Sequence, residues 1–448
     1  MGQTFSIKNL KKLMKHDREK GGALEENFIP QADVIRKKIN ELKKLRSVSR
    51  KKLRIKKITE EFFAIRSGRI SAVLEKRKAQ HDGAMTSALE LVAAEMNKKD
   101  FKVDIVQLPS LVAGKKVYGV GNSLSQILAV RFTQNVLKVI YDVKMPPRDM
   151  LVSQIKKLAL DGMPKFIVRA DVESFYESVR HKDLLDGIHQ SPELSVVIKR
   201  ILTRLIKNYE SLTGEAKGLP RGVGISAYLS EIYLSSIDAQ IKRHEDLFYY
   251  SRYVDDMILM YAPQRKDSAG GYLKVLEDTL MTKGLRVNSK TETINLLESQ
   301  VGKFEYLGYE FDMSPSKKGV RLSLKKFNKY KDRIDKSFAD YIKKEKFVAK
   351  KAAEELYIRA LYLTGNMRLF NRKSNAFIGV YFSNKFITDT KQLKGLDAMY
   401  QAKVRGISDS ALARRLAKLS FVDGFEKKIF RGFDAVKLSL IARGWTHA

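Results

Sequence analysis

The sequence predicts an α+β protein in which helical regions lie before and after a mixed region of strands and helices. Three observations predict this class. Residues up to about Lys99 show the apolar spacing of amphipathic helices, residues 100–325 alternate strand-like with helical runs, and the pattern from about Lys325 onward is almost entirely helical. A chain of 448 residues is long enough for two or three domains, and we expect them at 1–95, 96–325 and 326–448.

The composition points to a polyanionic partner. Lys and Arg number 85 against 51 for Asp and Glu, which gives a formal net charge of +34. So large an excess of positive charge makes nucleic acid the first candidate partner. The absence of Cys excludes disulfides, Cys-ligated zinc and iron–sulfur clusters. No apolar run approaches the roughly 18 residues of a membrane span, so we expect a cytoplasmic protein without a membrane partner.

The positive charge is concentrated in residues 36–57, which carry twelve basic side chains and the single acidic residue Glu41. The apolar face of this segment is thin, so the segment is expected to be a surface helix or helix pair. Basic residues do not alternate with acidic ones that would pair with them inside the helix. The segment is therefore expected to contact phosphates, with a merely solvated basic face as the alternative.

The elements after this segment can be placed from their patterns. Residues 101–109 and 115–121 are typical of strands, and residues 119–123 are expected to form a turn, because the further glycines of a phosphate-binding loop are missing. Residues 123–158 are helical with a break at 144–149, where two prolines occur. In the last third, one buried helix face is predicted from the recurrence of Phe327, Tyr330, Ile334, Phe338 and Tyr341.

Three carboxylates carry the chemistry. Asp171 stands where the apolar strand that begins at Phe166 ends, and Asp255 and Asp256 are adjacent in an otherwise apolar segment whose pattern is that of a hairpin with an acidic tip. Paired acids between apolar runs are costly unless cations neutralise them. A pair of solvated acids in a turn is the alternative, but a third acid on a separate strand favours a metal site. Oxygen ligands without His or Cys select Mg²⁺ over Zn²⁺.

Two such ions would activate a 3′ hydroxyl and stabilise a departing pyrophosphate, which is nucleotidyl transfer. Five segments then occur in the order and approximate spacing of motifs A to E of the reverse transcriptase palm, and the chain resembles that superfamily over residues 100–325. They are DVESFY from Asp171, GLPRGVGIS at 218–226, YVDD at 253–256, GLRVNSKTE at 284–292 and KFEYLGYEF at 303–311.

The resemblance implies a right-hand polymerase, with fingers, a palm built on an antiparallel sheet and a helical thumb, and here with a basic helical N-terminal extension. Motif B departs from retroviral, retron and group II intron enzymes, which carry a Gln before the glycine, where this chain has Arg221. With Glu231 in the following run, the pattern is similar to bacterial antiphage reverse transcriptases of the abortive-infection and defence-associated groups.

Roles follow residue by residue from the resemblance. Asp171 and Asp255 would bind both metal ions, Asp256 would support that pair or the primer end, and Val172 would be a further metal ligand. Tyr176 occupies the steric-gate position, which implies deoxynucleotide substrates, whereas the neighbouring Phe175 is expected to belong to the core.

Lys290 matches the motif D lysine that assists pyrophosphate departure, with an ordinary surface lysine as the alternative. Arg221 is expected to hold the triphosphate or the template backbone. Lys144 and Arg148 are candidates for phosphate ligands on the fingers side. Small residues would allow close approach of the nascent base pair at Gly222, Gly224 and Ser226.

The resemblance also implies a primer grip at Tyr306, Leu307 and Gly308, followed by a thumb. Basic residues available there to a template–primer duplex are Lys325, Lys326, Lys329, Lys331 and Arg333. Residues 364–384 stay unassigned, because their aromatic side chains suit base stacking and core packing equally.

The resemblance therefore implies a reverse transcriptase that makes DNA from deoxynucleotides with Mg²⁺, or with Mn²⁺ as a substitute. Expected partners are RNA, nascent DNA and dNTPs, with a noncoding RNA as template or scaffold in a bacterial antiphage system, and with a second defence protein or self-association left open. The alternatives are an RNA-binding maturase or chaperone and an untemplated or protein-primed DNA polymerase. An RNA-dependent RNA polymerase is disfavoured by Tyr176 and motif B.

Overall fold

The computed structural model describes residues 2–112, 114–143, 146–263, 271–371 and 374–446, which divide into two compact units. The first unit comprises Met1–Lys144, Ser174–Asp238 and Thr282–Leu285, and the second comprises Met145–Glu173, Ala239–Met281 and Arg286–Ala448. Among the described residues, no helix has both the length and the apolar character needed to span a bilayer.

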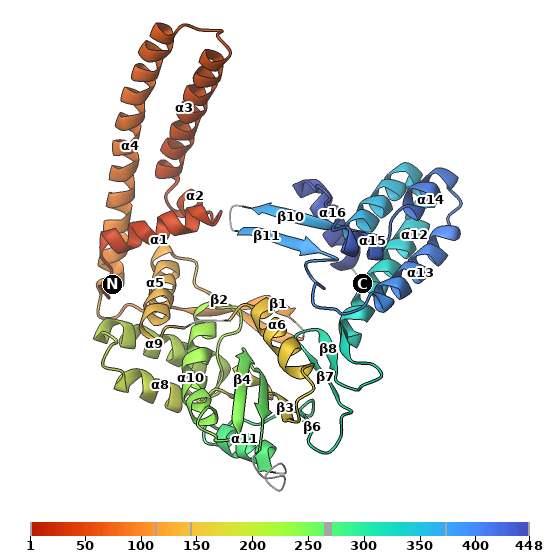
Figure 1. Cartoon of the computed structure of the whole chain (residues 1–448). Coiled ribbons are helices and arrows are strands. Elements are labelled where there is room, and N and C mark those ends of the chain that lie inside the picture. The colour runs from red at the N-terminus through yellow and green to blue at the C-terminus, as the bar shows by residue number, and fades with distance from the viewer. Residues whose placement is uncertain (1, 113, 144–145, 264–270, 372–373, 447–448) are drawn as a thin grey trace. The chain divides into compact units, whose positions relative to one another are not determined.

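The first unit begins with α1 (Ile7–Glu19) and α2 (Leu24–Phe28), followed by a long helical hairpin of α3 (Pro30–Arg54) and α4 (Glu60–Asn97), which run side by side (Figure 1). Pro30 starts α3, where its missing N–H costs nothing. Thr59 caps α4 by accepting a hydrogen bond from the backbone N–H of Phe62 at 3.2 Å. The prediction that helices extend to about Lys99 is confirmed.

Ion pairs hold the base of this hairpin. The buried carboxylate of Glu25 lies 3.1 Å from Arg36 Nε and 2.8 Å from His81 Nε2, which joins α2, α3 and α4. Burial opposes ionisation of Glu25, but His81 and Arg36 outweigh it and lower the pKa of Glu25. Arg36 and Lys37 also pair with Asp33, so these two residues of the basic segment are neutralised within the protein.

Beyond its base the hairpin has little core. Ile39, Ser49 and Leu74 are buried along it, whereas Leu45, Phe62 and Ile65 are 47%, 50% and 60% exposed. Two helices alone cannot bury a wide apolar face, so packing holds the distal part weakly.

The remainder of the first unit includes a two-stranded antiparallel ribbon of β1 (Ile105–Val112) and β2 (Lys115–Val120), which confirms both predicted strands. Tyr118 of β2 donates its backbone N–H to the carbonyl of Arg221 at 2.7 Å, which ties the ribbon to motif B. The helices of this unit are α5 (Leu124–Ile140), α7 (Phe175–Ser178), α8 (His181–Gln190), α9 (Val196–Thr213) and most of α10 (Ile225–Ile241).

The second unit contains a four-stranded antiparallel sheet in the order β4-β5-β3-β6. Its strands are β3 (Phe166–Asp171), β4 (Leu247–Tyr253), β5 (Asp256–Tyr261) and β6 (Glu292–Asn295). Strands β3 and β5 are mostly apolar because they are central and buried on both faces. The helices α6 (Arg148–Ala159) and α11 (Tyr272–Met281) belong to the same unit.

A three-stranded antiparallel sheet follows, of β7 (Lys303–Tyr306), β8 (Tyr309–Asp312) and β9 (Gly319–Leu322). Helix α12 (Leu324–Thr364) then reverses direction at Val348, whose backbone is not helical (φ −140°, ψ 54°). The side chains of Asp340 and Arg359 form an ion pair, with Arg359 Nη1 at 2.6 Å from Asp340 Oδ2. In a straight helix, the 19 positions between these residues would place them about 28 Å apart along the axis. Helix α12 is therefore a helical hairpin with two antiparallel arms.

The predicted face of α12 is confirmed. Ile334, Phe338 and Tyr341 are buried in the core of the second unit, and Phe327 and Tyr330 pack against that core. The same core receives α13 (Lys391–Arg405), α14 (Ser410–Ala417) and α15 (Phe421–Glu426), and α16 (Ala435–Thr446) lies against α12.

The expectation of an almost wholly helical last third is wrong in one place. The strands β10 (Asn366–Asn371) and β11 (Ser374–Gly379) form an antiparallel hairpin inside the unassigned segment 364–384. Short runs with Asn, Gly and aromatic residues are poor helix formers, and pairing satisfies their backbone groups instead.

Close packing of helix α15 on α12 provides a stability test. A Cβ added at Gly424 would lie 1.7 Å from the carbonyl oxygen of Thr364, so Gly424→Ala must displace backbone. We expect it to lower the free energy of unfolding by about 3 kcal/mol in urea titrations.

Gly395→Ala, in the interior of α13, is the matched control, because its Cβ would meet nothing within 4 Å. It should raise stability by up to about 1 kcal/mol. Equal unfolding midpoints for the two variants would contradict the packing described here.

Candidate functional site

The end of the four-stranded sheet brings the three predicted acids together. Asp171 is the last residue of β3 and Asp256 the first of β5, and the two are directly opposite in the antiparallel register. Tyr253 pairs with Asp256 across the β4–β5 hairpin, so Val254 and Asp255 form a two-residue turn. The acids of motifs A and C therefore occupy one end of adjacent strands, all in the second unit.

The turn that carries Asp255 is strained. Val254 has φ +62°, in the left-handed region that β-branched residues rarely adopt and that costs on the order of 1–3 kcal/mol. Its carbonyl accepts a hydrogen bond from Arg252 at 2.7 Å, and the carbonyl of Asp255 accepts one from the N–H of Val172 at 3.4 Å. These contacts hold Asp255 next to the end of β3.

Asn288, within motif D, holds Asp171. Its amide Nδ2 donates to Asp171 Oδ2 at 2.5 Å, and its backbone N–H donates to the Asp171 carbonyl at 2.8 Å. The carboxylate is thus oriented by a neutral donor, which leaves its negative charge uncompensated. Sequence reasoning chose Lys290 from this motif and missed Asn288.

Arg169 is the second residue that sequence reasoning missed. Its guanidinium donates to Asp256 Oδ1 at 2.7 Å and to the carbonyl of Lys290 at 2.9 Å. The sequence contains a signal that could have identified Arg169. It is a cation inside an apolar strand, two residues before Asp171, so its side chain must face the same side as that acid. Arg169 therefore connects the two central strands with the motif D loop.

The charge balance at the site is unfavourable without cations. Burial raises the pKa of Asp256 to about 6; Arg169 opposes this shift, and the charges of Asp171 and Asp255 add to it. The three carboxylates thus repel one another at this end of the sheet. Such a set of hard oxygen donors fits divalent cations of the Mg²⁺ type.

Val172 suits a role as a backbone ligand. Its antiparallel partner is Val287, and the flanking hydrogen bonds are made by Glu173 with Arg286 and by Asn288 with Asp171. In such a non-hydrogen-bonded pair the carbonyl of Val172 points away from Val287, toward the turn with Asp255. Within the described ranges, however, no three acidic or His side chains are close enough to hold a metal ion by themselves. Side chains and the Val172 carbonyl would have to act together.

Lys290 is placed by its backbone rather than by its side chain. Its N–H donates to Asn288 Oδ1 at 2.8 Å, its carbonyl accepts from Arg169, and its side chain is exposed. The assignment of its ammonium group to pyrophosphate stays a prediction.

In the first unit, Tyr176 lies in a charged cluster with Arg221. The Arg221 guanidinium carbon is 5.0 Å from the centre of the Tyr176 ring, and its Nη2 is 2.9 Å from Glu177. Lys115 binds the other oxygen of Glu177 at 3.0 Å. Burial of Glu177 opposes its ionisation, but these two cations lower its pKa. Phe175 is buried, which confirms its expected place in the core.

The small residues of motif B serve the loop itself. A Cβ at Gly222, which has φ +97°, would lie 2.8 Å from the carbonyl oxygen of Tyr118, and a Cβ at Gly224 would lie 2.4 Å from Gln134. Ser226 is buried and donates to the carbonyl of Pro220 at 2.8 Å. The expected contact with a nascent base pair stays a prediction, whereas close packing inside the protein already requires these residues.

The predicted primer grip is the β7–β8 hairpin. Leu307 (φ +47°) and Gly308 (φ +75°) form its two-residue turn, and positive φ at both positions is typical of a type I′ turn. The buried Tyr306 donates its hydroxyl to the Asp256 carbonyl at 3.2 Å. This hydrogen bond connects the hairpin to β5, the strand that begins with Asp256.

Arg148 lies beside this hairpin in the second unit, and its expected role as a fingers-side phosphate ligand stays a prediction. It donates to the carbonyl of Leu307, and its guanidinium is 5.6 Å from the ring centre of Tyr309. The reason is position: Arg148 begins α6, which packs in the second unit. Lys144, the other candidate, lies outside the described residues.

Lys326 approaches the same ring, with its Nζ 4.3 Å from the centre of Tyr309. Burial, and next the charge of Arg148, lower the pKa of Lys326 to about 7. Of the other basic residues expected in a thumb, Arg333 lies over Trp445, whereas solvent reaches Lys325, Lys329 and Lys331.

Comparison with known proteins bears on these motifs. Residues 123–311 match the family model described as "Reverse transcriptase (RNA-dependent DNA polymerase)". The matched range includes Asp171, Tyr176, Asp255 and the β7–β8 hairpin. No curated protein matches the chain.

Solved structures of telomerases are among the matches. Apo telomerase from Candida tropicalis has 12% identity over 77% of this chain and 61% of that chain, with a TM-score of 0.37. A form truncated from the C-terminal domain has 17% identity over 50% of this chain and 55% of that chain, with a TM-score of 0.35. Telomerase from Candida albicans, in complex with a fragment of telomeric RNA, has 13% identity over 80% of this chain and 66% of that chain, with a TM-score of 0.37.

The chain thus spans between about half and two thirds of the length of these telomerase chains. The family match covers the motifs that hold the three acids at the end of the sheet. Residues 123–311 thus match the domain of RNA-directed DNA polymerases, which are nucleotidyltransferases.

Proposed function

We propose that the protein synthesises DNA from deoxynucleotides on an RNA template by two-metal nucleotidyl transfer. The observation that carries this proposal is the register of β3 and β5, which sets Asp171 opposite Asp256 with Asp255 in the adjoining turn. Bound at this sheet end, two Mg²⁺ ions would activate the primer 3′ hydroxyl and stabilise the leaving pyrophosphate, and Mn²⁺ would substitute for them.

The chain's own residues would divide the work. Asp171, Asp255 and the Val172 carbonyl are the proposed ligands, with Asn288 orienting Asp171. The hydrogen bond from Arg169 favours the ionised form of Asp256 and holds it in place, so Asp256 would support the pair of ligands. Lys290 is the proposed cation near the departing pyrophosphate.

Tyr176 is proposed as the group that selects deoxynucleotides. Its ring would occupy the space that the 2′ hydroxyl of a ribonucleotide needs, and the Arg221 guanidinium at 5.0 Å supports the ring from one side. Arg221 itself would bind the triphosphate or the template backbone, in exchange for part of its pairing with Glu177.

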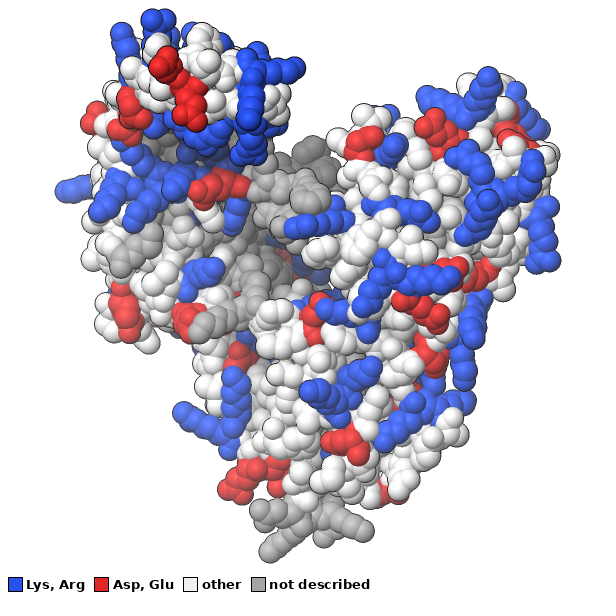
Figure 2. Space-filling model, turned by 45° about the horizontal axis from the view of Figure 1, so that its top comes forward, with Lys and Arg blue, Asp and Glu red and all other residues white. Residues whose placement is uncertain are grey.

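RNA is the proposed template or scaffold, and a bacterial antiphage system in the cytoplasm is the proposed setting. A net charge of +34 supports an RNA partner, and Lys and Arg side chains are spread over the face drawn in Figure 2 with fewer Asp and Glu between them. The defence role rests on the motif B resemblance around Arg221 and Glu231 alone. An RNA-binding maturase or chaperone, which would need no synthesis, is the competing function.

Removal of one catalytic charge tests the chemistry. Asp255→Asn keeps the shape of the turn but removes a proposed ligand, and we expect kcat for dNTP incorporation on an RNA template to fall by at least about 10³-fold. Asp278→Asn, the same change at an exposed position on α11, should leave kcat within about twofold. Equal activity in both variants would support the maturase-like alternative.

The gate is tested by ribonucleotide discrimination. Tyr176→Ala should raise kcat/KM for ribonucleotides relative to deoxynucleotides by at least about tenfold, because the ring no longer fills the space beside the sugar. Tyr176→Phe, which retains the ring, should discriminate like the wild type. The gate assignment fails if Ala and Phe variants discriminate alike.

The basic hairpin is tested through the salt dependence of RNA binding. A variant with Gln at four exposed lysines of α3 should bind RNA more weakly, and the slope of log K against log[salt] should fall by about 0.7–0.9 per lost phosphate contact. The four positions are Lys43, Lys44, Lys51 and Lys52. Gln at four exposed lysines of the second unit should change the slope little; they are Lys317, Lys318, Lys391 and Lys394. Identical slopes for both sets would mean that the charge of α3 is only a solvated face.

A further inference from the structure

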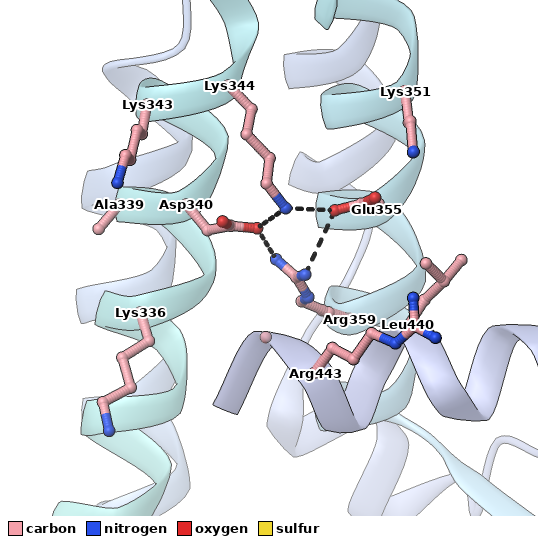
Figure 3. Close-up of a pocket in the computed structure, with 11 residues that line it drawn as sticks. Lys336, Ala339, Asp340, Lys343, Lys344, Lys351, Glu355, Arg359, Leu440 and Arg443 are labelled. Atoms are coloured by element: carbon pink, nitrogen blue, oxygen red, sulfur yellow. Dashed lines mark hydrogen bonds and ion pairs between the residues drawn. The ribbon is translucent and has the colours of Figure 1, made fainter. Parts of the chain in front are cut away.

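A cavity of about 530 Å³ lies between the two arms of α12 and helix α16, within the second unit (Figure 3). Six basic and two acidic side chains line it, the basic ones being Lys336, Lys343, Lys344, Lys351, Arg359 and Arg443. None of these residues belongs to the proposed polymerase site.

The centre of the cavity is an internally neutral network. Lys344 Nζ lies 2.9 Å from both Asp340 and Glu355, and Arg359 lies 2.6 Å from Asp340 and 3.4 Å from Glu355 (Figure 3). Burial opposes ionisation of Asp340, but hydrogen bonds from Lys344 and Arg359 lower its pKa and so favour its charged form. The two acids are thereby matched by two cations, and the network fixes the two arms of α12.

Further positive charge surrounds this network without a matching acid. Lys336 and Lys343 stand two helical turns apart on one arm, and Lys351 stands on the other (Figure 3). Within the described part of the chain these three lysines form no ion pair, and the lining contains no carboxylate besides Asp340 and Glu355. Like charges around one hollow repel one another unless an anion is bound.

A second cavity of about 480 Å³ adjoins the first, since Lys336 lines both. It adds Lys329, Arg333 and the rings of Tyr362 and Trp445, with Asp332 as its acid. The indole N–H of Trp445 donates to Ser337 at 3.1 Å, and Arg333 lies 4.6 Å from the centre of the ring. Trp445 is the one tryptophan of the sequence, so its fluorescence reports on this region.

We propose that the cavity between α12 and α16 binds a terminal polyphosphate group, carried by a free nucleotide or by the 5′ end of an RNA strand. A phosphodiester brings one negative charge and a terminal phosphate up to about two, so only linked phosphates match three or more clustered cations. The adjoining rings of Trp445 and Tyr362 suit the base that follows such a group. Phosphate binding here is distinct from catalysis at Asp171 and Asp255.

Tripolyphosphate is the probe, titrated in EDTA into the full chain carrying Asp255→Asn, with calorimetry and Trp445 fluorescence as readouts. We expect saturable binding that Gln at Lys336, Lys343 and Lys351 weakens by about tenfold or more, because three charge-assisted contacts are lost. The matched control has Gln at Lys346, Lys350 and Lys394, which are exposed and do not line the cavity. It should bind within about twofold of the parent.

ATP and a pair of RNA oligonucleotides of one sequence, with a 5′ triphosphate or a 5′ hydroxyl, distinguish the two sources. Tighter binding of the triphosphorylated RNA that is lost in the Lys336/Lys343/Lys351 variant supports a strand end, and ATP binding lost in that variant supports a free nucleotide. The proposal is overturned if tripolyphosphate does not saturate, or if both triple variants lose affinity equally. Single Lys343→Gln and Lys351→Gln variants, at exposed positions, give the same readouts should the triple variant misfold.

Discussion

Antiparallel pairing of β3 with β5 is the constraint on which the rest of the site depends. Because side chains in a ladder alternate between faces, a shift of β3 by one residue would turn Asp171 and Arg169 together away from Asp256. The buried apolar residues of both strands hold this register, and the strained Val254 turn is tolerated because the same strands over-determine it. The geometry of the candidate site is thus a by-product of core packing.

The carboxylates were predictable from sequence because each stands out against an apolar background, and their order along the chain matched the reverse transcriptase motifs. Arg169 and Asn288 were not predicted, since a role that consists of orienting another residue depends on a register that one sequence does not reveal. Helices and most strands followed from periodicity. The β10–β11 hairpin did not, because its short mixed runs suit several structures.

Motif B shows how a residue predicted to bind substrate can also be structural. The Arg221 guanidinium contacts Glu177 and Tyr176, and its backbone carbonyl accepts a hydrogen bond from Tyr118 of β2, so the residue is held within the protein. Gly222 permits the close approach of Tyr118 that this arrangement needs. The predicted contact of Arg221 with a nucleotide and its contact with Glu177 would therefore use the same guanidinium group.

The α3–α4 hairpin extends well beyond its ion-paired base, since the part of α4 that precedes His81 spans about 32 Å. Its distal part is held by few apolar contacts and carries several unpaired lysines, so local opening there costs far less than global unfolding. Amide hydrogens near the tip will exchange rapidly in the free protein. A polyanion bound along the hairpin would slow that exchange while leaving the melting of the second unit unchanged. Amide exchange in the hairpin would therefore report whether a polyanion is bound there.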